Sequence, residues 1–309
     1  MKLQITIYLL IIQLASCGLL NKKPENNNEL ALLALASPAT NTLSTQCVTV
    51  MHSDSDDTIM LGDGNGENIY STGIQGYFAA ISSDLQTIYP TFLNNGYNIK
   101  SVSLIDGAEQ NLLGRSYSNG FEVTNPQMSP DGTRLTFMGK DDSPTFHDVY
   151  VANTDGSGVK QLTFVTDKND AYPAWKSDSV VTYSGTRNGG TTYQLYQYDL
   201  STDTETAITG TQDYTWHDWD GDTVVALNGA TSDIEILDTS TGQKTVITGN
   251  FYSSKVFFLP NGRIIYHNLA GPNSRYDVLS NNREGTDEVN LTNMDDSSEL
   301  VSDVRCATL

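Results

Sequence analysis

The sequence predicts an all-β protein, a six-bladed β-propeller built from four-stranded antiparallel blades. Three observations support this fold class. The chain is rich in Tyr (16) and Gly (25), while only 17% of its residues are charged, which is typical of short strands joined by tight turns. Strand-turn-strand units recur with a period of about 43 residues, the length of one propeller blade. Residues 47–309 are enough for six such units, with five or seven blades as the alternatives.

The first 16 residues predict a secretory signal peptide. Lys2 is followed by an apolar run of about ten residues, which is too short to span a bilayer. The run ends in Leu14-Ala15-Ser16-Cys17, which resembles the bacterial lipobox. This resemblance implies that Cys17 carries a covalent diacylglycerol and fatty acid and becomes the first residue of the mature chain. Residues 17–46, with a polar stretch of low complexity, predict a flexible tether.

Four repeat units follow one another between residues 126 and 292. The clearest unit contains the segments 126–138, 148–156 and 159–163, and the next three span residues 173–210, 216–249 and 256–292. Asp131-Gly132, Asp220-Gly221 and Asn261-Gly262 fall at the same turn of their units, where a tight hairpin requires positive φ. A less regular fifth unit takes its strands from residues 76–81, 99–105 and 110–113.

The clearest unit also resembles a known repeat. Ser129-Pro130-Asp131-Gly132 precedes an aliphatic strand, and Asp148-Val149-Tyr150, Asp155-Gly156 and Gln161-Leu162-Thr163 follow. This pattern is similar to the WD40-like repeat of TolB-like and periplasmic prolyl-oligopeptidase propellers, and the resemblance covers residues 71–293. It implies a propeller in the bacterial cell envelope, with a partner in an envelope complex.

The two ends of the repeat region are each too short for a blade. We expect Cys47 to Tyr70 and the segment around Leu300–Arg305 to pair and complete the sixth blade. Cys47 and Cys306 lie near these ends, and in an oxidising compartment an even pair favours a disulfide. Closure of the ring would bring their Cα atoms within the required distance of about 7 Å. Two free thiols are the alternative.

The charge balance limits the partners. Lys and Arg number 17 against 37 Asp and Glu, for a net charge of −20. Nucleic-acid binding is excluded as an unaided function, because it requires clustered basic residues. Anionic lipid headgroups are disfavoured for the same reason, so the membrane is reached through the lipid anchor. We expect a monomeric propeller.

Motifs for catalysis are missing from the sequence. It contains no Gly-x-Ser-x-Gly elbow, no Walker loop and no His-Glu-x-x-His, and no chain remains after the ring for a peptidase domain. We therefore predict no catalytic residues. His217 and Asp218 lie on a predicted inner strand and are the candidates for ligand binding in a central channel. The other histidines, His52, His147 and His267, occupy different blade positions, which argues against a shared metal site.

Two acidic strings are candidates for calcium. Asp218, Asp220 and Asp222 alternate along one string, and Asp63, Asn65 and Glu67 offer oxygen ligands beside glycines in the other. The first string coincides with a hairpin turn that needs Asp-Gly in any case, and the second lacks the length of an EF-hand loop. No other cofactor is expected.

These observations predict a lipid-anchored scaffold that binds a protein, peptide or glycan without catalysis. The expected location is the outer membrane of a bacterium, on its periplasmic or surface face. One alternative is a propeller enzyme, such as a polysaccharide lyase or glycosidase with a site facing the channel. Another is a structural surface-exposed lipoprotein without a small ligand. Convergence of His217 with a second histidine and a carboxylate would favour the enzyme.

Overall fold

The computed structural model describes most of the chain from Thr45 onward. The described residues are 45–93, 97–114, 122–140, 146–164, 170–187, 190–210, 212–249, 251, 255–269, 275–292 and 298–308. The predicted signal peptide, Cys17 and the tether up to residue 44 lie outside the described residues. In the described part of the chain, no helix has the length and apolar character needed to cross a membrane.

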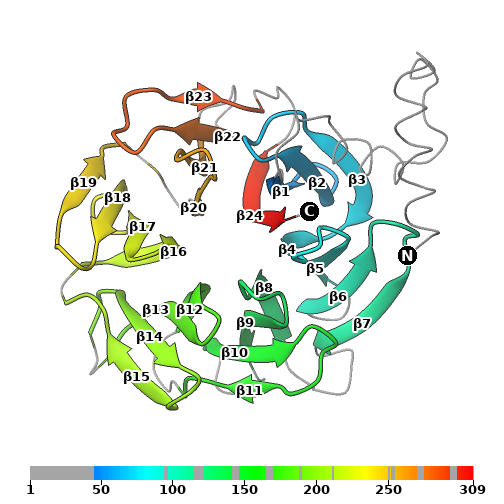
Figure 1. The fold of residues 1–309 in the computed structure, drawn as a ribbon, viewed down its shortest axis with the longest axis horizontal. Helices are drawn as coiled ribbons and strands as arrows, with labels where there is room; N and C mark the ends of the chain where they lie inside the picture. Colours follow the sequence, from blue (N-terminus) through cyan, green and yellow to red (C-terminus); the bar gives the residue numbers. More distant parts are fainter. Residues whose placement is uncertain are drawn as a thin grey trace.

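The described strands form six four-stranded antiparallel sheets arranged in a ring (Figure 1), which confirms the predicted six-bladed propeller. From the centre outward, the strands are as follows: blade 1, β24 (Glu299–Thr308), β1 (Thr45–Ser53), β2 (Thr58–Asp63) and β3 (Tyr70–Gln75); blade 2, β4 (Tyr77–Ile81), β5 (Thr87–Leu93), β6 (Tyr97–Ser103) and β7 (Glu109–Gly114); blade 3, β8 (Glu122–Met128), β9 (Arg134–Lys140), β10 (Asp148–Asn153) and β11 (Lys160–Gln161); blade 4, β12 (Ala171–Ser177), β13 (Val180–Gly185), β14 (Gln194–Asp199) and β15 (Thr204–Ala207); blade 5, β16 (Tyr214–Asp220), β17 (Thr223–Asn228), β18 (Asp233–Asp238) and β19 (Lys244–Ile247); blade 6, β20 (Val256–Phe258), β21 (Ile264–Leu269), β22 (Tyr276–Asn281) and β23 (Val289–Asn290).

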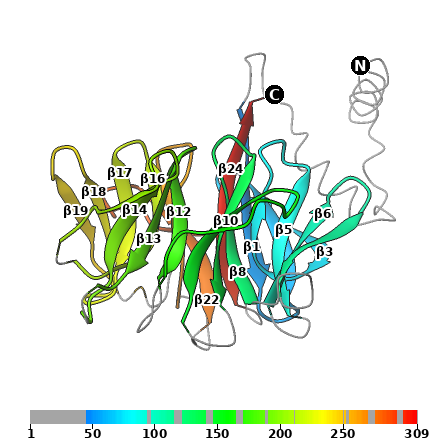
Figure 2. The same cartoon turned by 90° about the horizontal axis from the view of Figure 1, so that it is seen from below.

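The ring closes within blade 1, as predicted. The last strand, β24, pairs antiparallel with the first strand, β1, and Cys47 lies directly opposite Cys306. The two cysteines form a disulfide. Figure 2 shows β24 running alongside β1 through the height of the ring. Strands from the two ends of the chain therefore complete one sheet, and the disulfide links them covalently.

One strand of blade 2 was not expected from the sequence. β5 contains Pro90, a residue that is depleted in strands because it has no N–H to donate. Pro90 lies opposite Ala79 of β4, and the register between β5 and β6 is interrupted at Tyr89 and Pro90. The strand thus tolerates the proline where its pairing is locally incomplete.

The hydrophobic core lies between the blades. Six apolar clusters are each shared by two neighbouring blades. Val50 of blade 1 packs with Ile81 of blade 2. The cluster between blades 6 and 1 contains Phe257 and Val301. Because each blade buries both faces against its neighbours, burial of apolar surface holds the ring together.

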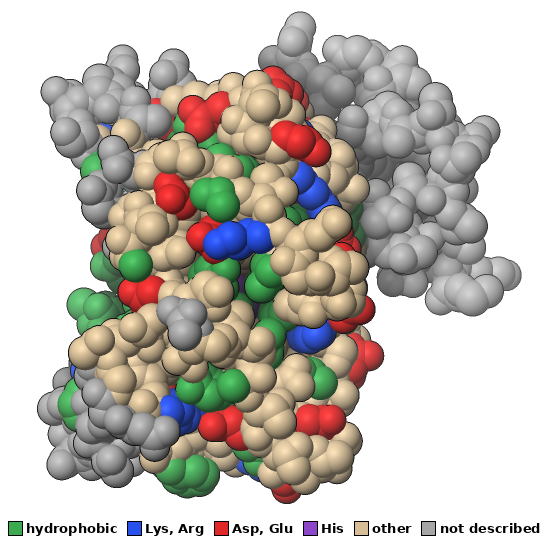
Figure 3. Space-filling view, turned by 90° about the vertical axis from the view of Figure 1, so that its left-hand side faces the viewer, with side chains coloured by type: hydrophobic (Ala, Val, Ile, Leu, Met, Phe, Trp, Pro, Cys, Tyr) green, Lys and Arg blue, Asp and Glu red, His purple; other side chains and the backbone are tan. Residues whose placement is uncertain are grey.

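The side of the ring that carries β18 and β19 is mostly polar. Figure 3 shows acidic and basic side chains scattered there among other polar groups, with apolar side chains exposed in small groups.

Candidate functional site

Five residues occupy equivalent positions, four on inner strands and one directly before the inner strand β20. In each blade, the residue lies three positions before an inner-strand residue that pairs with the start of the second strand. The paired residues of the second strands are Ile88, Leu135, Val181, Val224 and Ile264. Equivalent positions of a propeller lie at one level of the channel. We call this set the channel plug; its members are Phe78, Asn125, Tyr172, Trp216 and Lys255.

Aromatic rings of the plug meet across the channel. The ring centroids of Tyr172 and Trp216 are 4.0 Å apart, and those of Phe78 and Trp216 are 6.2 Å apart. Phe78 belongs to blade 2 and Trp216 to blade 5, which face each other across the ring. Their contact therefore narrows the channel at this level.

The backbone is strained at two plug positions. Asn125 has φ of 54° and Tyr172 has φ of 56°, and the register of each inner strand shifts around them. A bulky side chain is uncommon in this left-handed region, and such residues cost about 1–3 kcal/mol each. These two bulges direct an amide and an aromatic ring into the channel.

Lys255 is the charged member of the plug. Its side chain is only 2% exposed, and its ammonium lies 4.3 Å from the ring centroid of Phe78 and 4.9 Å from that of Trp216. Within the described part of the chain, Nζ has no hydrogen-bond partner, although an ammonium has three N–H groups to donate. Burial lowers the pKa of Lys255 to about 7, and the nearby carboxylate of Asp303 opposes this shift.

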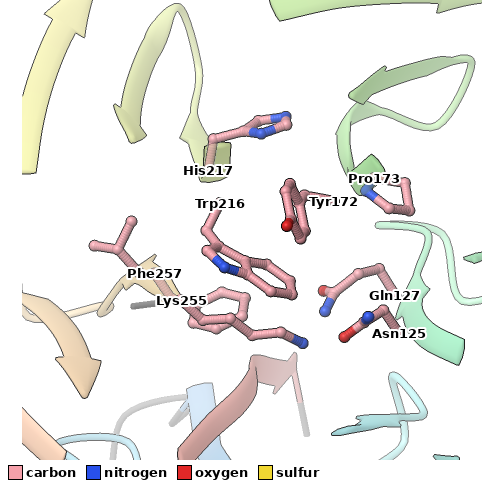
Figure 4. A pocket seen from close by; sticks show the side chains of 9 residues that line it. Asn125, Gln127, Tyr172, Pro173, Trp216, His217, Lys255 and Phe257 are labelled. Carbon is pink, nitrogen blue, oxygen red and sulfur yellow. The ribbon is translucent and has the colours of Figure 1, made fainter. Parts of the chain in front are cut away.

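A small inner pocket adjoins this ammonium (Figure 4). Asn125, Gln127, Tyr172, Trp216, His217 and Lys255 are among its lining residues, and its volume of about 10 Å³ is close to that needed for one water molecule. Asn125 Oδ1 is also buried without a hydrogen-bond partner among the described residues. The pocket thus combines one unpaired donor group with polar atoms on the opposite wall.

The structure places His217 and Asp218 on the channel wall, but they face different surroundings. His217 is 5% exposed, and its Nε2 is hydrogen-bonded to Thr182 Oγ1 at 2.8 Å. Burial lowers the pKa of His217 to about 4, so its ring is neutral at pH 7. Asp218 is partly exposed and lies in a larger cavity next to the inner pocket.

This larger cavity forms the mouth of the channel and has a volume of about 350 Å³. It lies at the C-terminal ends of five inner strands, and the mouth is lined by Gln127, Met128, Pro130, Ala174, Trp175, Asp218, Trp219, Asp220, Phe258, Leu259, Pro260, Gly262, Arg283, Asp303, Val304, Arg305 and Cys306. Gln127 also lines the inner pocket. The two hollows therefore adjoin each other at Gln127.

Charged side chains of the mouth have fixed partners. Arg283 forms an ion pair with Asp220 at 2.6 Å. The Asp218 carboxylate accepts a hydrogen bond from the Phe258 N–H at 2.9 Å. Burial raises the pKa of Asp218 to about 7, and the nearby Arg305 opposes the shift. Arg305 of blade 1 donates to carbonyl oxygens of blade 3, those of Met128 and Ser129, and so reaches past blade 2.

The remaining histidines lie in different places. His52, on β1, packs edge-to-face against the ring of Phe78 in the plug, with centroids 5.1 Å apart, and contacts Asp54 Oδ1 at 3.1 Å. His267 is on β21 beside the ring of Tyr276, and His147 directly precedes β10. Among the residues that the structure describes, no three His, Cys, Asp or Glu side chains gather as metal ligands would. The convergence that would favour an enzyme is not found in that part of the chain.

Both strings considered for calcium lie at hairpin turns. Asp63 Oδ1 accepts hydrogen bonds from the backbone N–H groups of Asn65 and Glu67. Asp220 pairs with Arg283, and Asp222 lies 3.5 Å from Lys176 Nζ. These carboxylates therefore have turn-forming and ion-pairing roles in the structure.

Comparisons with solved structures identify the same architecture. TolB from Acinetobacter baumannii is 18% identical over 86% of this chain and 67% of its own, with a TM-score of 0.68. The chain therefore has the TolB propeller fold. A structure of a nidogen/laminin complex matches with 12% identity over 85% of this chain and 98% of that chain, at a TM-score of 0.58. An oligogalacturonate lyase in complex with manganese matches with 13% identity, 70% and 72% coverage and a TM-score of 0.50.

No protein-family model and no curated protein matches the sequence. A chain of a nidogen/laminin complex and a lyase both resemble this propeller, so the fold does not determine the activity. The function has to be inferred from the channel.

Proposed function

We propose that this protein is a lipid-anchored scaffold of the bacterial cell envelope that binds a segment of a partner protein at the mouth of its channel. The mouth cavity carries this proposal. Its volume of about 350 Å³ falls in the range of ligand-binding pockets, and it is the larger hollow on the channel axis.

The walls of the mouth suit a peptide segment. Pro130, Trp219 and Pro260 contribute accessible apolar surface. Asp220 and Arg283 contribute a charged pair formed between two blades. A segment that presents both apolar and charged side chains could satisfy such a wall. Because the mouth is built on rigid strands, little ordering of the scaffold would oppose binding.

The anchor and the location rest on the sequence around Cys17. A lipid at this residue would attach the propeller through a tether of about 30 residues, whose r.m.s. span is about 30 Å if it is flexible. Metabolic labelling with a palmitate analogue tests the anchor. We expect labelling of the wild type and its loss in Cys17→Ala; equal labelling of both would refute lipidation at this residue.

Site-specific photocrosslinking tests the binding role. A photoreactive amino acid at Pro260, in the mouth, should crosslink one partner in the intact envelope, and the same group at Ser240, an exposed position on the β18–β19 turn, should not. Arg283→Glu should weaken the crosslink, while Lys160→Glu, the same charge change on the outer strand β11, should not. Identical products from both positions, or no effect of Arg283→Glu, would contradict docking at the mouth. A crosslinked glycan in place of a protein would also overturn it.

A further inference from the structure

Lys255 is the group in the channel whose position is hardest to explain as part of the scaffold. An ammonium group transferred from water to a buried site loses its hydration, and structures normally compensate with an ion pair and hydrogen bonds. Lys255 Nζ has no hydrogen-bond partner among the residues that the structure describes. The rings of Phe78 and Trp216 offset part of the loss through cation–π contacts, but they leave the N–H groups unsatisfied.

The nearest candidate for a counter-ion is already engaged. Asp303 influences Lys255 electrostatically, but one of its oxygens accepts from the N–H of Ile81 at 3.1 Å and the other from the N–H of Val304 at 2.9 Å. Asp303 lines the mouth, while the inner pocket around Lys255 has no acidic residue among its lining groups. His217 lines this pocket as a neutral ring, so it supplies no negative charge.

The dimensions of the inner pocket restrict what could complete the site. Its volume of about 10 Å³ admits one oxygen-sized atom and excludes a larger group. A carboxylate can place one oxygen in such a space while its second oxygen and carbon lie outside it, on the side of Gln127, which also lines the mouth. Phosphate and sulfate present a bulkier tetrahedral group.

We infer that the inner pocket is a carboxylate-binding subsite, in which the ammonium of Lys255 pairs with one carboxylate oxygen of a ligand that enters from the mouth. The inference deepens the proposed function, on which it rests for the route of entry. The carboxylate would belong to the partner segment, as a C-terminus or an acidic side chain. The rings of Phe78 and Trp216 hold the lysine stem and keep the ion pair away from water, which strengthens it.

Formate is the probe that isolates this chemistry, with formamide as its neutral counterpart of similar size. At constant ionic strength, a formate concentration about ten times its dissociation constant should raise the melting temperature of the wild type by a few degrees. Formamide should have no such effect. The shift should disappear in Lys255→Met and persist in Lys176→Met, because Lys176 also lies over a tryptophan ring, 4.6 Å from that of Trp219, but is partly exposed and faces Asp222.

Equal shifts in the wild type and in Lys255→Met would overturn the subsite, and so would equal shifts with formate and formamide or no saturable shift at all. A second measurement separates this result from the docking proposal. If the Pro260 crosslink fails while formate still stabilises the wild type through Lys255, the docking proposal is wrong and the subsite stands. If the crosslink forms and formate has no effect, the partner docks without a carboxylate in the inner pocket.

Discussion

The substitution Lys255→Met should stabilise the protein at neutral pH in the absence of ligand. Methionine matches the length of the lysine stem and removes a buried ammonium for which the described residues supply no hydrogen-bond partner. A pKa that falls from 10.5 to about 7 on folding corresponds to about 4 kcal/mol of lost stability at pH 7, at 1.36 kcal/mol per unit. Loss of the cation–π contacts with Phe78 and Trp216 should subtract about 2 kcal/mol. We therefore expect a net gain of about 2 kcal/mol.

The pH dependence supplies the sign of this effect. Because the folded-state pKa of Lys255 is lower than the unfolded value, the stability linked to this group is present above about pH 10.5 and is lost as pH falls toward about pH 7. As pH rises from 7 to 10, the free energy of unfolding of the wild type should therefore increase relative to that of Lys255→Met. Tyrosines that titrate in the same range are shared by both proteins, so their contribution cancels in the difference.

Urea unfolding followed by tryptophan fluorescence measures the difference directly. Free energies of unfolding from linear extrapolation should favour Lys255→Met at pH 7, and the advantage should narrow or vanish near pH 10. Lys176→Met serves as the control, since Lys176 is partly exposed beside Asp222, and its difference from the wild type should vary little with pH. A variant less stable than the wild type at pH 7, with no change in the difference at higher pH, would refute the reasoning.

Three further substitutions test other parts of the structure. Cys306→Ser removes a disulfide that spans 259 positions and should cost at most about 5 kcal/mol of stability; a urea midpoint equal to that of the oxidised wild type would contradict this. Burial raises the pKa of Asp218 from 3.8 to about 7, so the wild type loses the stability linked to this group as pH rises from about 4 to about 7. Asp218→Asn should become more stable relative to the wild type over this range, and the opposite trend in unfolding experiments would contradict the assignment. Gly132→Ala and Gly221→Ala both place a side chain at positive φ, but only the first meets another blade, because its Cβ would lie 1.8 Å from Ser83 Oγ. Melting temperatures should therefore fall by more in Gly132→Ala, and equal losses would contradict a tight contact between blades 2 and 3.

The architecture could be predicted from the sequence because each blade repeats its own local signals. Asp131-Gly132 and Asn261-Gly262 mark the same hairpin in different blades, and both glycines adopt positive φ, 71° and 84°. Closure followed from the length left over at the two ends and from the even pair of cysteines. The sequence does not predict β5, because proline is depleted in strands. In the structure, the blade accommodates Pro90 where the pairing between β5 and β6 is interrupted.

The channel site was predicted only in part. The sequence predicts His217 and Asp218 on an inner strand, which is β16 in the structure. It contains no motif that predicts the plug. Its members differ in chemistry, so no motif connects Asn125, Tyr172 and Lys255. Aligning the repeats position by position would have placed them at one level, because each lies three residues before an equivalent paired position. The burial of Lys255 depends on rings contributed by distant blades, which no local pattern encodes.

The net charge of −20 and a carboxylate-binding subsite are compatible, because they act over different distances. Repulsion between the acidic surface and an anionic ligand extends over about one Debye length, about 8 Å at physiological ionic strength, and lowers the association rate. The ion pair with Lys255 forms in a buried pocket, where salt screens it far less. Added potassium chloride should therefore speed the association of a carboxylate ligand and change its dissociation rate little. Stopped-flow fluorescence measures both rates for a partner segment with a free carboxylate. A decrease in the association rate with added salt would show that a cationic group of the ligand, and not its carboxylate, directs the ligand into the channel.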